Sequence, residues 1–186
     1  MLQEKYMPAY DVRKAVNIII DVDPPVVFSA MSHLQLHWSW ITTLAYRIRG
    51  MKPPQFFGWK QLKKSRFTML EVEREKEIIL GIIGSFWTTT VDVKTFQPEE
   101  FVTLSFTGCA KATWNFELRQ ISENKTLLRT ETRVLCPGRV AKIKFCFYWF
   151  IIQPFSTLIR KEILESIKMQ AEGSRRLKST YSANIH

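Results

Sequence analysis

The chain has 186 residues, of which 46% are hydrophobic and 24% are charged, the balance of one globular domain with a sizeable core. Its net charge of +10 favours anionic partners. The sequence has no zinc-ligand spacing, helix-turn-helix pattern or aromatic RNA-binding signature, so nucleic acid is not an expected partner.

The cysteines and the N-terminal residues indicate a reducing compartment. Cys109, Cys136 and Cys146 form no CxxC pair and lie in apolar stretches, which predicts buried structural thiols. Residues 1–16 lack the apolar core of a secretory signal, in agreement with a cytoplasmic location.

The first third of the chain predicts a strand followed by two short helices. Residues 14–23, KAVNIIIDVD, alternate in the manner of a strand, and Asp23 can cap a proline-headed helix directly after it. Apolar residues at i, i+3, i+4 and i+7 predict a second helix over residues 38–49. Residues 51–58 contain two prolines and are expected to be irregular, and residues 59–66 fit either a helix or a loop.

The middle of the chain predicts antiparallel strands. Residues 67–74 and 76–83 are expected to form a hairpin with a tight turn between them. Residues 88–96 are β-branched and are expected to be extended, and residues 101–106 are expected to form a further strand.

A second hairpin is the clearest signal in the sequence, with strands over residues 110–121 and 126–136. On its return strand the alternation separates two faces. The face with the better core residues is Leu128, Thr130, Thr132 and Val134, and the other is Arg129, Glu131 and Arg133.

A long C-terminal helix is predicted next. Apolar residues recur every four positions over residues 155–171, which indicates one buried stripe, whereas residues 140–152 are apolar nearly all round. Pro154 is expected to kink or restart the helix. Residues 174–186 are polar and are expected to be a flexible tail, which leaves residues 1–173 as a single domain.

The run Phe145–Ile159 contains fifteen consecutive uncharged residues. A membrane span needs about 20 apolar residues, and Gln153 and Pro154 interrupt this run. We therefore expect a buried helix. Its all-round apolar half needs a second apolar neighbour, which is the helix over residues 38–49, a bound ligand or another subunit.

The order of these elements predicts an α+β fold. Five segments carry a resemblance to the START-like, polyketide-cyclase-like superfamily (SRPBCC), in a bacterial branch. They are IDVDPPVVFSAM (20–31), EIILGIIGSFW (77–87), TETRV (130–134), FYWFIIQPFSTLIR (147–160) and IKMQAE (167–172). The resemblance implies the helix-grip fold, a curved antiparallel sheet wrapped around a long C-terminal helix, with two short helices after the first strand. It also implies an apolar cavity between sheet and helix, which in relatives binds lipids, sterols or polyketides.

Candidate ligand-binding residues are aromatic, aliphatic or basic side chains expected near that cavity, where an arginine would bind an anionic head group. For the aromatic residues, simple core packing is the competing interpretation. The candidates are Trp38, Trp40, Arg47, Trp87, Trp114, Arg133, Tyr148, Trp149, Ile152 and Arg160.

Two carboxylates, Glu77 and Glu131, are the candidates for catalysis. If they face the cavity, either is a potential general base, and Glu131 with Arg133 would orient a polar head group. If they face outward, they belong to an ordinary cross-strand charge ladder, which the alternation favours. His33 and His37 have no neighbouring Cys or carboxylate ligands, so we expect no metal and no cofactor.

We interpret the sequence as that of a binding or carrier protein for a small hydrophobic ligand, lipid-like or polyketide-like and with or without an anionic group. The first alternative is a cyclase- or hydrolase-type enzyme that uses a pocket carboxylate. The second is a module that docks on an anionic membrane or a protein partner through a basic face. A homodimer is left open by the sequence.

Overall fold

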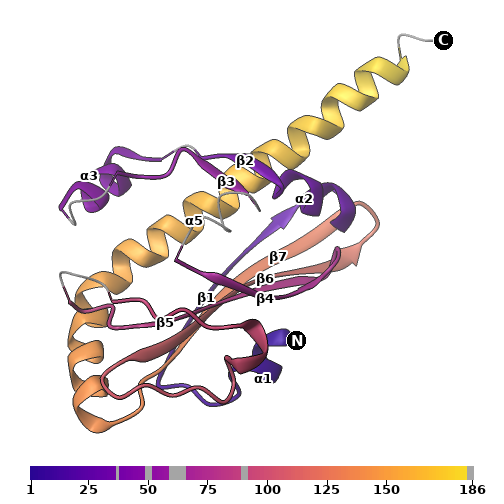
Figure 1. The fold of residues 1–186 in the computed structure, drawn as a ribbon. Helices are drawn as coiled ribbons and strands as arrows, with labels where there is room; N and C mark the ends of the chain where they lie inside the picture. The colour runs from indigo at the N-terminus through magenta and orange to yellow at the C-terminus, as the bar shows by residue number, and fades with distance from the viewer. Residues whose placement is uncertain (37, 49–51, 59–65, 89–91, 184–186) are drawn as a thin grey trace.

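The computed structural model describes residues 1–36, 38–48, 52–58, 66–88 and 92–183 (Figure 1). In chain order the helices and strands are α1 (Leu2–Tyr6), β1 (Val12–Ile20), α2 (Pro24–Ala30), β2 (His33–Gln35), α3 (Trp40–Ile48), β3 (Phe56–Gly58), β4 (Thr68–Glu73), β5 (Glu77–Gly84), the 3-10 helix η1 (Pro98–Glu100), β6 (Ala110–Ser122), β7 (Lys125–Leu135) and α5 (Arg139–Ala183).

Five strands form one antiparallel sheet in the order β1-β7-β6-β5-β4, and β2 and β3 form a separate antiparallel pair. Both predicted hairpins are confirmed. Their tight turns place Glu75 at a φ of 63° and Asn124 at a φ of 56°, both in the left-handed region, which the short polar side chain of Asn tolerates better than most. A β-bulge between Met69 and Glu71 interrupts the pairing of the edge strand β4.

The long helix α5 crosses one face of the sheet, which we call the inner face (Figure 1). Its predicted stripe is buried at Ile163, Leu164 and Ile167, against sheet residues such as Phe116 and Leu128, whereas Phe155 at the start of the stripe is exposed. Helix α2 follows β1 directly, as predicted, and adds Val27 and Ala30 to this core. The residues of β6 and β7 that the alternation assigned to the core therefore face α5, as predicted.

The opposite face, which we call the outer face, is also covered at its centre. Leu2 and Met7 from the α1 region pack there with Phe96 and Phe101, on β5 residues such as Ile79. All eight residues of β5 are buried for this reason. The sheet thus separates two apolar clusters where β5 runs.

Helix α5 contains Pro154, and Figure 1 shows that the helix axis changes direction between its first part and the remainder. A proline removes one backbone donor and crowds the preceding turn, which is a physical reason for such a change of direction. Assigned helix continues to Ala183. The flexibility of residues 174–186 stays a prediction.

Side chains of α5 also reach the free edge of β1 and the residue after it. The Nζ of Lys168 donates to the backbone oxygen of Ile19 at 2.9 Å, and Glu172 accepts from the backbone N–H of Asp21 at 3.1 Å. The C-terminal half of α5 is therefore hydrogen-bonded to the sheet edge as well as packed on its face.

Several predictions about individual segments need correction. The run Phe145–Ile159 is helical but is not buried throughout, because Phe147 and Phe150 on its outer side are exposed. The expected strand over residues 101–106 is wrong, because Lys111 Nζ donates to the backbone oxygens of Val102 and Leu104 and holds this segment as a loop. Residues 51–58 are not irregular throughout, because they include β3. Cys146 is exposed, whereas Cys109 and Cys136 are buried as predicted.

Two further expectations fall wholly or partly outside the described residues. The ambiguous segment 59–66 is one, since residues 59–65 are not described. Of the stretch 88–96, residues 89–91 are not described, and Val93 forms an isolated bridge with Gly84. Within the described part of the chain, each helix is too short or too polar to cross a membrane.

Candidate ligand-binding site

A cavity of about 290 Å³ lies between the inner face of the sheet and the first half of α5. This volume is at the lower end of the roughly 300–1,000 Å³ found for small-molecule sites. Most of its walls are apolar, with hydroxyl groups at one threonine, one tyrosine and one serine. The lining residues are Phe67, Ile82, Phe86, Ala112, Thr132, Val134, Phe145, Tyr148, Trp149, Ile152 and Ser156.

The helix wall of this cavity follows from helical spacing. Phe145, Tyr148, Trp149, Ile152 and Ser156 recur three or four residues apart and therefore share the face of α5 turned to the sheet. The ring of Phe145 is central to this wall. It stacks on the ring of Trp149 with centroids 5.9 Å apart and lies 6.0 Å from the ring of Tyr148.

The sheet wall combines small and β-branched side chains. Ala112 on β6 and Thr132 and Val134 on β7 occupy inner-face positions, and Ile82 on β5 lies beside them. A methyl group at Ala112 leaves space that a larger side chain would fill. The alternation of β6 and β7 in the sequence shows which residues face the helix, but it does not show that a cavity lies beside Ala112.

Three of the predicted ligand-binding residues, Tyr148, Trp149 and Ile152, line the cavity. Trp87 lies behind the wall, with its ring in edge contact with Phe145 at 6.2 Å. Trp114 packs in the core beside the wall residue Phe67, with ring centroids 5.7 Å apart. Its indole N–H donates to Thr130 Oγ1 at 2.7 Å.

The candidates from α3 and the residues before it lie elsewhere. Trp38 packs against the main core and donates its indole N–H to the backbone oxygen of Pro54. Trp40 is 75% exposed, and Arg47 is exposed as well. The described part of α3 contributes no residue to the lining of this cavity. Thr42 on α3 instead donates its hydroxyl hydrogen to Glu162 on α5, at 2.9 Å.

Arg160 lies just behind the cavity and is 7% exposed. Its guanidinium donates to Ser156 Oγ at 2.6 Å and to Thr132 Oγ1 at 2.8 Å, both of which belong to lining residues. Burial lowers the pKa of Arg160 to about 10, so the guanidinium stays charged at neutral pH.

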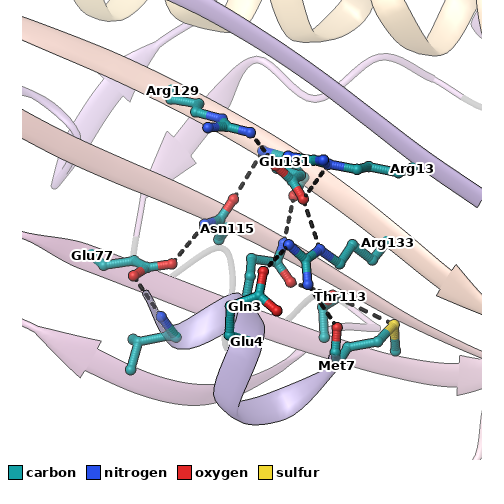
Figure 2. A network of polar contacts seen from close by, with 11 residues as sticks. Gln3, Glu4, Met7, Arg13, Glu77, Thr113, Asn115, Arg129, Glu131 and Arg133 are labelled. Atoms are coloured by element: carbon teal, nitrogen blue, oxygen red, sulfur yellow. Dashed lines mark hydrogen bonds and ion pairs between the residues drawn. The ribbon is translucent and has the colours of Figure 1, made fainter. Parts of the chain in front are cut away.

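Glu131 and Arg133 face neither the cavity nor bulk solvent. They lie on the outer face under α1, in the polar network that Figure 2 shows. Arg133 donates to Glu131 at 2.7 Å and to the backbone oxygen of Met7 at 2.9 Å, and it forms a further ion pair with Glu4. Arg133 therefore does not line the cavity, which corrects its assignment there.

Glu131 is fully buried and accepts hydrogen bonds from three arginines. Arg13 contributes two of them, at 2.9 and 3.0 Å, and Arg129 and Arg133 contribute the others. Burial pushes the pKa of Glu131 upward, but the hydrogen bonds from Arg13 and Arg133 outweigh it, so the pKa is lowered. Glu131 is consequently an ionised structural carboxylate.

Glu77 belongs to the same outer-face network (Figure 2). It accepts from the backbone N–H of Leu2 at 2.7 Å and from Asn115 Nδ2 at 2.6 Å, so it ties α1 to the sheet. The sheet lies between both candidate carboxylates and the cavity. Neither Glu77 nor Glu131 reaches a ligand bound there, and the general-base assignment is incorrect for this cavity.

The sequence favoured a cross-strand charge ladder for Glu131 and Arg133, and this interpretation is only partly correct. The alternation placed these residues correctly on the opposite face from Leu128 and Val134. It did not show that α1 covers this face, because α1 is a five-residue helix with no strong sequence signal. Gln3 completes the cover by donating to the Glu131 backbone oxygen at 3.0 Å.

No family model matches the chain, and the search of curated proteins finds no significant match. Solved structures similar to it include a conserved protein from Geobacillus kaustophilus, with 10% identity, a TM-score of 0.38, and coverage of 84% of this chain and 95% of that one.

Two further similar structures are an aromatase/cyclase and a dimeric protein. The Zhui aromatase/cyclase from a Streptomyces species has 8% identity and a TM-score of 0.34, with 87% of this chain and 93% of that chain covered. The Aha1 dimer from Colwellia psychrerythraea has 12% identity and a TM-score of 0.31, with 80% and 96% covered. With a five-stranded antiparallel sheet and a long C-terminal helix across its inner face, this chain has the helix-grip fold.

Proposed function

We propose that this protein binds a small hydrophobic ligand in the cavity between the sheet and α5, as a binding or carrier protein. The observation that supports this proposal is the cavity itself, which has apolar walls and is partly open to solvent. A ligand bound there would gain roughly 25 cal/mol for each Å² of apolar surface that leaves water. Ordering the ligand and the side chains would offset part of that gain.

Filling the cavity tests the proposal. The variant Ile152→Trp places a larger side chain on the helix wall, and we expect it to weaken binding of the neutral fluorescent probe N-phenyl-1-naphthylamine at least tenfold. The matched control is Ile151→Trp, because Ile151 is the adjacent residue, is exposed and does not line the cavity. Fluorescence titration of the wild type and both variants measures the dissociation constants.

The outcome depends on the contrast between the two tryptophan variants. Equal loss of binding in both would place the probe outside the cavity. A wild-type protein that binds no neutral probe, together with native mass spectrometry that finds no co-purified ligand, would contradict the proposal.

An exposed apolar surface on α5 favours a second function, docking on an anionic bilayer. We define the α5 outer surface as Val140, Ile143, Phe147, Phe150 and Ile151, all of which are exposed. Phe147 is 72% and Phe150 is 80% exposed, although both are large aromatic residues. A contiguous exposed apolar patch of this kind typically marks a contact surface.

The charges around this surface favour an anionic lipid surface as its partner. Arg139, Lys142 and Lys144 lie in the first turns of α5, and the sequence contains no Asp or Glu from Arg139 to Lys161. Lys142 is paired with Asp11 at 2.6 Å, and this ion pair leaves its side chain 54% exposed. Helices with aromatic residues on one face and basic residues beside it bind at the lipid headgroup level.

Replacing apolar residues of the α5 outer surface by acidic ones tests its role in membrane binding. We expect the double variant Phe147→Glu/Phe150→Glu to lose binding to vesicles containing anionic phosphatidylglycerol in a flotation assay. The control Val72→Glu/Val102→Glu changes the charge equally at two other exposed apolar residues and should still float. Binding should weaken in high salt, because surface charges are screened.

A second copy of the chain is the competing occupant of the α5 outer surface. Light scattering of the wild type and of Phe147→Glu/Phe150→Glu distinguishes it. A wild-type dimer that this variant converts to a monomer, without vesicle binding by either, would assign the surface to self-association and overturn membrane docking.

A further inference from the structure

The charge of Arg160 is buried beside the cavity without a carboxylate partner among the described residues. Its donors are directed to the Ser156 backbone oxygen at 3.0 Å, to the Ser156 hydroxyl and to the Thr132 hydroxyl. Its Nε is buried and has no hydrogen-bond partner in the part of the chain that the structure describes. Buried charges in proteins are ordinarily paired, so this site lacks a negative group.

Arg133 on the outer face shows the usual arrangement of a buried charge, which is pairing with carboxylates. Arg133 is buried too, but its guanidinium contacts the carboxylates of Glu131 and Glu4. Thus Arg133 on β7 is buried with its counter-charges, whereas Arg160 on α5 is buried beside the cavity without a carboxylate partner among the described residues.

The hydroxyls of Ser156 and Thr132 connect Arg160 to the cavity. Each hydroxyl oxygen accepts a hydrogen bond from the guanidinium, and both residues line the cavity. No described residue accepts the hydrogen of either hydroxyl. A hydroxyl whose oxygen accepts from a cation becomes a better donor, since hydrogen bonds in a chain polarise one another.

We infer that the ligand carries an oxyanion, such as a carboxylate or sulfonate, and that this group lies at the Ser156–Thr132 end of the cavity. The two hydroxyls donate to it, and Arg160 supplies the positive charge behind them. The rest of the ligand contacts the aromatic wall of Phe145 and Trp149. This inference rests on the proposed function and specifies its ligand class, an amphipathic acid.

Two probes with one ring system test the inference. N-phenyl-1-naphthylamine is neutral, and 8-anilino-1-naphthalenesulfonate is the same molecule with a sulfonate added. We expect Arg160→Met to weaken binding of the sulfonate probe about tenfold and to leave the neutral probe within about twofold of the wild type. The control Lys161→Met removes the same charge from the adjacent exposed residue and should change neither constant.

A second variant keeps the charge and removes the donors. Ser156→Ala/Thr132→Val retains Arg160 but lacks both hydroxyls, and we expect the same selective weakening for the sulfonate probe. This variant decides the question if Arg160→Met does not fold, as judged by circular dichroism.

The results separate this inference from the proposed function. If Arg160→Met, or the hydroxyl variant in its place, binds both probes as tightly as the wild type, the oxyanion site is overturned and the apolar cavity stands. If the wild type binds neither probe, both proposals fail. Equal weakening by Arg160→Met and Lys161→Met would indicate a diffuse effect of surface charge, which also contradicts the site.

Discussion

Glu131→Gln is expected to lower the free energy of unfolding by about 3–5 kcal/mol, because it removes the anion from a buried set of ion pairs. Glutamine has nearly the same size, so packing is preserved. Arg13, Arg129 and Arg133 would lose their shared counter-charge, and Arg133 is itself buried. The glutamine amide would also direct N–H donors toward the cationic guanidinium groups.

Urea denaturation at pH 7 measures this loss. The control Glu73→Gln removes the same charge from an exposed residue of β4 and should change stability by no more than about 0.5 kcal/mol. Similar stabilities for Glu131→Gln and the wild type would show that the outer-face network contributes little.

The pH dependence gives a second signature of the same carboxylate. The pKa of Glu131 is lower in the folded protein than its ordinary value of 4.5, so the folded state keeps this group ionised to lower pH. The resulting stabilisation is complete above pH 4.5 and is lost as the pH falls through the folded-state value. Glu131→Gln should therefore lack this part of the acid destabilisation seen in the wild type.

Arg160→Met is expected to have the opposite effect on stability to Glu131→Gln. It should raise the free energy of unfolding by about 1–4 kcal/mol in the ligand-free protein. Methionine fills a similar volume. Because its side chain is uncharged, it avoids the desolvation cost of a buried guanidinium. The lowered pKa of Arg160 expresses the same cost, because the folded state binds this proton less tightly than the unfolded chain does. That cost is complete below about pH 10, so measurements at pH 7 detect all of it.

The same urea experiment checks this prediction, with Lys161→Met as the neutral reference. Saturating sulfonate probe should then stabilise the wild type more than Arg160→Met, because only the wild type offers a charge to the probe. A clear loss of stability in ligand-free Arg160→Met would mean that the guanidinium is already well compensated. Residues that bind ligands commonly reduce stability in this way.

Local sequence patterns predicted most of the architecture. Period-two alternation placed the two hairpins, and four-residue spacing placed the buried stripe of α5, because both patterns depend only on backbone geometry. Tertiary contacts decided the rest. Phe101 to Phe106 has the composition of a strand, but Lys111 holds its backbone as a loop against the outer face.

The candidate site was predicted in part for the same reason. Tyr148, Trp149 and Ile152 were found because they share one face of a strongly apolar helix segment. The sheet wall at Ala112 was missed, since a small residue gives no signal until the side chains opposite it are known. The role of Glu131 depended on α1, which lies far from it in sequence and covers it in space.

The bonds from Lys168 and Glu172 to the backbone at the end of β1 have a consequence for aggregation. A free strand edge is a template on which another chain can add a strand, and native proteins protect such edges. Here the α5 side chains occupy backbone groups at one edge, and the bulge in β4 disrupts regular pairing at the other. Copies of this protein are thus discouraged from joining edge to edge into extended sheets.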